Sequence, residues 1–230
     1  MMLKTQLNEI DSACDQFKKT IDDVATLYLA SESSASILAA IQLPDDFELQ
    51  MHLSDDFPKE ATTIRDTGDV LRLYRSGTYG RLNSYQVVIS LCSVFEVWVK
   101  SVADKLRAPE RKSISITSWR RENRPEVVKN QTLCLVRSIH DKYGIDSQLG
   151  ADDTLCWIYN FFLIRNAIVH EGGMLRERTR SRLVAGWKKR PTDQYLVISG
   201  NDIDDMVHLI KLNVSSFAYK VHEKCAEPAI

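Results

Sequence analysis

Apolar residues recur at spacings of three and four along most of the chain, and this pattern predicts a mostly α-helical protein. The first apolar stripe covers residues 3–28 and predicts one long amphipathic helix. A serine-rich stretch at 31–36 is expected to interrupt or end that helix. A further helix is expected over 59–74, with the glycine-containing segment 76–80 ending it.

Residues 81–106 are apolar nearly all the way round a helix, which is typical of a helix at the centre of a bundle. The uncharged run inside it, 82–95, is shorter than the roughly 20 residues that a bilayer span needs, so we expect a buried core helix. Glu96 stands inside this apolar helix. It has two interpretations: an ion pair with Lys100 four residues later, or a carboxylate that faces a functional site.

The C-terminal half continues the helical pattern. Pro125 suits the first turn of a helix that Gly144 would end. Residues 195–198 resemble a short strand, and Gly200 is expected to open a last helix. The predicted fold class is therefore a mostly α-helical bundle with at most a small β-hairpin near the C-terminus.

Composition places the chain among ordinary globular proteins, because 44% of the 230 residues are hydrophobic and 27% are charged. We expect an N-terminal helical extension at 1–75 and a helical domain at 76–230, together forming one compact unit. The five cysteines are scattered and form no metal-binding spacing, and no targeting segment is visible. These features predict a soluble, cytoplasmic protein without a membrane partner.

The charge distribution is uneven although the net charge is only -1. Residues 1–60 hold twelve acidic residues against four lysines, so the remainder of the chain carries an excess of positive charge. A basic body can bind a polyanion such as RNA. The alternative is that these charges form ordinary solvated helix faces.

Residues 157–173, WIYNFFLIRNAIVHEGG, place polar side chains in an otherwise apolar helix. This helix is expected over 154–170, with Asp152 or Asp153 as its cap and 172–173 as its glycine stop. Arg165, Asn166 and His170 lie near its end, and Asn166 and His170 share a face because they are four residues apart. An arginine among apolar residues needs an anionic partner or access to solvent.

The pattern Arg165-Asn-Ala-Ile-Val-His170 resembles the Arg-x4–6-His signature of the HEPN (higher eukaryotes and prokaryotes nucleotide-binding) superfamily. The helix before it, with its internal Glu96, is similar to the paired helix of that family, and the resemblance covers about residues 85–170. It implies a helical bundle that forms a homodimer and cleaves RNA without a metal or cofactor. Many members of the family serve toxin–antitoxin or antiviral defence systems, and some act with a separately encoded antitoxin or sensor protein.

The resemblance also implies roles for the residues. Arg165 would neutralise the phosphate, Asn166 would orient His170 or bind the phosphate, and His170 would transfer a proton, with Glu96 as a possible supporting carboxylate. Without the resemblance, Arg165 could instead pair with Glu96 or Glu171, and His170 could be an ordinary residue at a helix end. A catalytically silent dimerisation or RNA-binding adaptor is the alternative function.

The segment that follows the motif, 174–190, contains seven basic residues and one acidic residue. Cations of this density suit contacts with the RNA backbone, and a solvated loop is the alternative. The expected RNA-binding residues are Arg176, Arg178, Arg180, Arg182, Lys188, Lys189 and Arg190. Several Asp-Asp pairs occur, but helix capping accounts for them more simply than a metal site does, so no metal ligand is expected.

Overall fold

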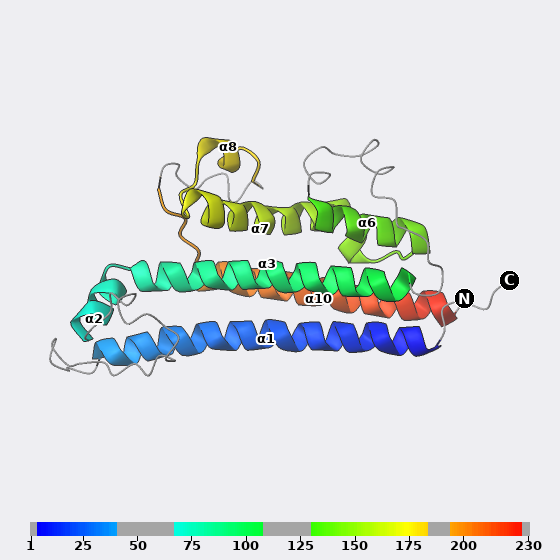
Figure 1. Cartoon of the computed structure of the whole chain (residues 1–230), viewed down its shortest axis with the longest axis horizontal. Helices are drawn as coiled ribbons and strands as arrows, with labels where there is room; N and C mark the ends of the chain where they lie inside the picture. Colours follow the sequence, from blue (N-terminus) through cyan, green and yellow to red (C-terminus); the bar gives the residue numbers. More distant parts are fainter. Residues whose placement is uncertain (1–3, 41–66, 108–129, 184–193, 227–230) are drawn as a thin grey trace, which may run out of the picture.

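The protein is described by a computed structural model, and the residues it describes are 4–40, 67–107, 130–183 and 194–226. Three long helices run side by side: α1 (Lys4–Ala40), α3 (Thr78–Arg107) and α10 (Gly200–Ala226) (Figure 1). Two further helices, α6 (Gln131–Tyr143) and α7 (Asp152–Glu171), lie nearly end to end along the side of α3 that faces away from α1 (Figure 1). The remaining elements are the short α2 (Thr67–Arg75), η2 (Gln148–Gly150) and α8 (Glu177–Arg180). The prediction of a mostly α-helical bundle is confirmed.

Helix α3 forms the centre of the bundle, because it packs against α1, α6, α7 and α10. An aromatic cluster joins four of these helices, with ring centroids 5.3–6.4 Å apart. Its members are Phe17 from α1, Phe95 and Trp98 from α3, Phe162 from α7 and Phe217 from α10. Burial of such rings supplies much of the apolar area that stabilises the fold.

The segment Thr78–Leu106 of α3 is long and apolar enough to cross a membrane by length and composition alone. Half of its most apolar window is buried by the rest of the chain. Core helices of soluble proteins combine length, apolar composition and burial in the same way. Among the described residues, no other helix is both as long and as apolar.

The prediction that residues 31–36 interrupt or end the first helix is wrong, because α1 continues through them to Ala40. Serine is a weak helix former, but other helices hold this segment. The Tyr79 hydroxyl donates to Ser31, and Asn83 donates to the carboxylate of Glu32 at 2.8 Å. These contacts come from α3, so tertiary structure overrides the local preference.

The helix ends that glycines in the sequence predict are found in the structure. Gly144 ends α6 in the left-handed conformation, with φ 61°, and Gly77 forms the turn between α2 and α3 with φ 69°. The helix expected over 59–74 is described only from Thr67 onward. Pro125 lies outside the described residues, and Asn130 is the residue that caps α6 by accepting from the Leu133 amide.

The strand expected over 195–198 is not formed. Within the described ranges, the chain pairs as β structure at one isolated antiparallel bridge, between Met174 and Tyr195. Leu196 and Ile198 are buried and their neighbours are exposed. The alternation that suggested a strand therefore reflects a single extended segment packed against the helices.

His140 lies in a buried polar network at the join of α6 and α7. Its Nδ1 donates to the Val136 carbonyl at 2.8 Å, and its Nε2 accepts from the Ser147 hydroxyl at 2.7 Å. Both ring nitrogens are therefore satisfied in the neutral imidazole. Burial lowers the pKa of His140 from its ordinary value of 6.5, because the charged form is poorly solvated there.

We expect this network to make stability depend on pH. A histidine whose folded pKa is depressed binds more protons in the unfolded chain, so its contribution is complete above pH 6.5 and falls as the pH drops below that value. The slope from one such group is at most about 1.4 kcal/mol per pH unit. Urea unfolding of the wild type and of His140→Gln between pH 7.5 and 5 measures how the free energy of unfolding changes with pH. Equal slopes for the two proteins would contradict the prediction.

Candidate active site

Helix α7 carries the motif, and its limits follow from its sequence. Gly172 ends it in the left-handed conformation, with φ 63°, as predicted. The prediction that Asp152 or Asp153 caps it is wrong, because Ala151 is the capping residue and provides no side-chain bond. The two aspartates lie in the first turn instead, where their charge favours the positive end of the helix dipole.

Arg165 is half-buried on the side of α7 that faces α3. Its Nη1 donates to Asn166 Oδ1 over a long 3.4 Å, and its buried Nε makes no hydrogen bond. In the described part of the chain, no carboxylate oxygen lies within 4 Å of the guanidinium, so the expected alternative pairing with Glu96 or Glu171 is absent. The guanidinium is therefore a half-buried permanent cation that can be satisfied by solvent or by a bound anion.

Arg165 of α7 and Glu96 of α3 both lie close enough to Cys92 of α3 to act on its thiol. Burial raises the pKa of the Cys92 thiol to about 12, while the positive charge of Arg165 lowers it and the negative charge of Glu96 raises it. Glu96 is half-buried, and the ion pair expected between Glu96 and Lys100 is not found among the described residues. Arg165 and Glu96 thus both act on the Cys92 thiol, and no ion pair joins the two among the described residues.

His170 and Asn166 are exposed on the last turns of α7. His170 makes no hydrogen bond to any described residue, so its ring nitrogens are open to a ligand. His170 lies five positions after Arg165 in the helix, which places them roughly 140° apart around the axis. Within one chain the arginine therefore faces inward and the histidine outward.

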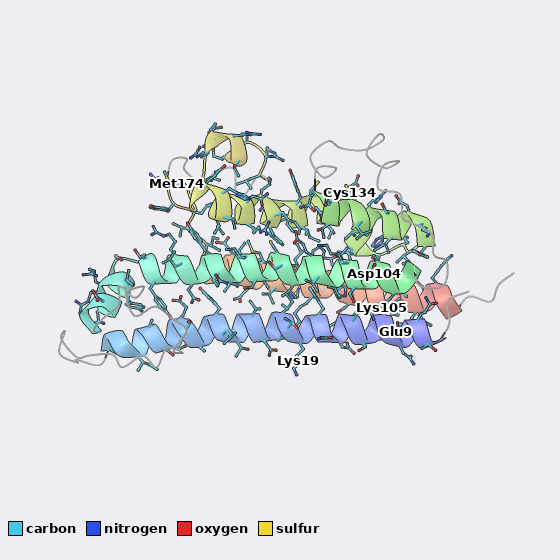
Figure 2. All side chains as sticks on the ribbon, in the orientation of Figure 1. Glu9, Lys19, Asp104, Lys105, Cys134 and Met174 are labelled. Carbon is cyan, nitrogen blue, oxygen red and sulfur yellow. The ribbon has the colours of Figure 1, made fainter. Side chains whose placement is uncertain are left out.

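The turn after α7 is fixed by Tyr85 of α3, a residue to which the sequence analysis assigned no role. Its hydroxyl lies 3.1 Å from the Gly173 carbonyl and 2.9 Å from the Leu196 carbonyl, and it donates to them. Figure 2 shows Met174 at this end of the bundle, where α7 ends and α3 begins. Nothing in the pattern around Tyr85 distinguishes it from the other core residues of α3.

The predicted RNA-binding residues differ in their surroundings. Arg176 and Arg178 are exposed and form no ion pair with other described residues. Arg180 pairs with Glu177 at 2.6 Å, and Arg182 lies over the Tyr159 ring and donates to its hydroxyl. Arg182 is thus engaged in holding the segment 174–183 on α7. Lys188, Lys189 and Arg190 lie outside the described residues.

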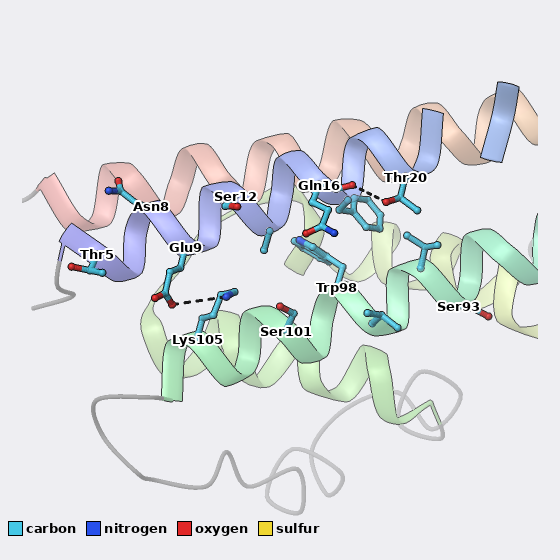
Figure 3. Close-up of a pocket in the computed structure, with 14 residues that line it drawn as sticks. Thr5, Asn8, Glu9, Ser12, Gln16, Thr20, Ser93, Trp98, Ser101 and Lys105 are labelled. Carbon is cyan, nitrogen blue, oxygen red and sulfur yellow. Dashed lines mark hydrogen bonds and ion pairs between the residues drawn. The ribbon is translucent and has the colours of Figure 1, made fainter. Parts of the chain in front are cut away.

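A groove of about 580 Å³ lies between α1 and α3 (Figure 3). Its floor is apolar, with Val94, Val97 and Trp98, and an ion pair of 3.9 Å between Lys105 and Glu9 lies at one end. The motif helix packs on the other side of α3 (Figure 1). This groove contains none of the motif residues, so we place the candidate site at the end of α7.

In the described ranges, no group of three or more histidine, cysteine, aspartate or glutamate side chains is arranged to hold a metal ion. Cys14, Cys92, Cys134 and Cys156 form no disulfide within the described residues. The chain matches no protein-family model, and comparisons with curated proteins and with solved structures find no match.

Proposed function

We propose that this chain is an endoribonuclease of the HEPN type that cleaves RNA without a metal ion or other cofactor. The observation that carries the proposal is Arg165, a half-buried cation that has no carboxylate partner among the described residues. It lies in the same helix as His170, whose ring is exposed and makes no hydrogen bond there. The resemblance of the Arg-x4-His pattern to the HEPN signature points to the same chemistry.

Cleavage by this route uses the 2′-hydroxyl of the RNA as the nucleophile. A base removes the proton of that hydroxyl, the 2′-oxygen bonds to phosphorus, and the bond to the 5′-oxygen breaks as that oxygen receives a proton. The products are a 2′,3′-cyclic phosphate and a 5′-hydroxyl. Arg165 would bind the non-bridging oxygens, His170 would transfer a proton, and Asn166 would orient the histidine or the phosphate.

A homodimer accounts for the separation of the two residues around α7. Arg165 and His170 lie roughly 140° apart on the helix, so a second copy could bring its own histidine to a shared phosphate. Two histidines would then divide the acid and base roles. We also propose that the enzyme works in the cytoplasm as a toxin or antiviral defence effector, restrained by a separately encoded antitoxin or sensor protein.

The test is incubation of the purified full chain with total RNA in the presence of EDTA. We expect fragments that carry cyclic-phosphate ends, because neither the arginine nor the histidine requires a metal. Fragment ends are read by their resistance to ligation before, but not after, treatment that removes the cyclic phosphate. Cleavage of an all-deoxy strand would contradict the mechanism, since such a strand lacks the nucleophile.

The second candidate function is a catalytically silent adaptor for RNA or for a partner protein. The separation of Arg165 and His170 around α7 favours it if no dimer brings the two residues together. This function predicts RNA binding with no cleavage under any buffer condition. The cleavage assay, run beside an RNA-binding assay, distinguishes the two functions, and light scattering shows whether a dimer is present. Binding of RNA without cleavage would support the adaptor.

A further inference from the structure

An aromatic residue and an arginine form an ordered pair next to the end of the motif helix. Arg81 of α3 lies over the ring of Tyr195, with its guanidinium carbon 3.9 Å from the ring centroid. Tyr195 is about half exposed, at 52%. Neither residue belongs to a motif that the sequence pattern associates with a function.

The backbone around Tyr195 is tied to the residues that follow His170. Leu196 donates to the Gly173 carbonyl at 2.8 Å, and Leu175 donates to the Gln194 carbonyl at 3.0 Å. Tyr85 joins both segments through its hydroxyl. Because Gly173 follows His170 by three residues, these bonds hold the backbone at Tyr195 next to the turn that follows the motif.

The chemistry of the pair suits a nucleotide. One face of the Tyr195 ring is covered by the Arg81 guanidinium, and the remaining exposed part is an aromatic surface on which a base can stack. Arg81 is half-buried, its Nε is buried without a hydrogen bond, and it forms no ion pair with any described carboxylate. Its charge is therefore available to a phosphate next to the stacked base.

We propose that Tyr195, supported by Arg81, stacks on an unpaired base of the RNA close to the phosphate that Arg165 and His170 would bind. This inference rests on the proposed function and specifies its substrate class: single-stranded RNA with an accessible base at the cleavage position. A double-stranded substrate keeps its bases stacked and cannot use this surface. Tyr195 would be a positioning residue, since it contacts the substrate away from the reacting atoms.

The test measures binding and cleavage separately. Binding uses a fluorescein-labelled single strand with 2′-O-methyl groups throughout, which cannot be cut by its own 2′-hydroxyl. We expect Tyr195→Ala to weaken binding about 5- to 150-fold, because stacking on one aromatic side chain contributes this much. Tyr195→Phe retains the ring and should bind like the wild type. A 2-aminopurine base in the strand should lose fluorescence on binding to the wild type and keep it with Tyr195→Ala.

Tyr219→Ala is the matched control. Tyr219 is 65% exposed on α10 and has a lysine, Lys220, 5.8 Å from its ring centroid, so it resembles Tyr195 in exposure and in its cationic neighbour. We expect it to bind RNA like the wild type. Thermal unfolding of each variant shows whether the fold is retained, and Arg81→Gln supplies a second variant that leaves the tyrosine in place.

The outcomes separate this inference from the proposed function. Equal binding by the wild type, Tyr195→Ala and Tyr219→Ala, with cleavage of natural RNA intact, would overturn the stacking role alone. If the wild type neither binds the modified strand nor cuts natural RNA, both proposals fail. Weaker binding by Tyr195→Ala with normal binding by Tyr195→Phe supports the inference.

Discussion

Replacing His170 with alanine is expected to reduce RNA cleavage in EDTA about 100- to 10,000-fold, because it removes the group that would transfer protons in the reaction. The fold should be unaffected, since the ring is exposed and makes no hydrogen bond to a described residue. The rate is measured on a synthetic RNA with one labelled end under single-turnover conditions. RNA binding should change far less than the rate.

His208→Ala is the control for this experiment. His208 is exposed on α10 and, like His170, has no hydrogen bond to another described residue. We expect this variant to cleave like the wild type. If His170→Ala also cleaves like the wild type, a contaminating nuclease or another mechanism accounts for the cleavage.

Arg165 variants test the role of the guanidinium in the same cleavage assay. Arg165→Lys keeps the charge and loses the planar pair of donors that suits a phosphate, so we expect it to retain part of the activity that Arg165→Ala loses. Light scattering of each variant checks that the oligomeric state is unchanged. A variant that cleaves normally without the guanidinium would contradict the role of Arg165.

The largest effect on stability is expected from Gly173→Ala. Gly173 has a φ of 80°, and an added Cβ would lie 2.5 Å from the Tyr85 hydroxyl oxygen and 2.6 Å from the ring carbon that carries it. The left-handed conformation costs an alanine about 1–2 kcal/mol, and overpacking against a buried ring adds about 1–3 kcal/mol. We therefore expect the free energy of unfolding to fall by about 2–5 kcal/mol.

Gly172→Ala provides the matched comparison, because its φ is 63° and a Cβ there would meet nothing within 4 Å. We expect a loss of about 1–2 kcal/mol, from the backbone conformation alone. Urea unfolding of both variants gives the difference. Equal losses would show that Tyr85 does not restrict the turn, which would also weaken the case that the turn is rigid beside His170.

The sequence by itself determined the features that depend on local interactions. The spacing of apolar residues along 154–170 predicts a buried helix, and the glycines after it predict where the helix ends, because a glycine adopts the left-handed conformation at little cost. The same reasoning located the end of α6 at Gly144. Arg165, Asn166 and His170 could therefore be placed near the end of one helix without any structure.

Tertiary structure decided the features that depend on residues far apart in the chain. Residues 31–36 stay helical because side chains of α2 and α3 bind them, with the Tyr74 hydroxyl 3.0 Å from the Ser36 hydroxyl as one such contact. The sequence could not predict this, since the contacting residues lie about 40–50 positions away.

For the candidate site too, some features follow from the sequence and others only from packing. Local spacing gives the faces that Arg165 and His170 occupy. Only packing shows that Arg165 lies near Cys92 and has no carboxylate partner within the described part of the chain. Packing also pairs Arg81 with Tyr195 across more than a hundred residues, and it engages Arg182 with Tyr159. The spacing of apolar residues predicts which face of a segment is buried. Only the folded chain shows which side chains pack against that face.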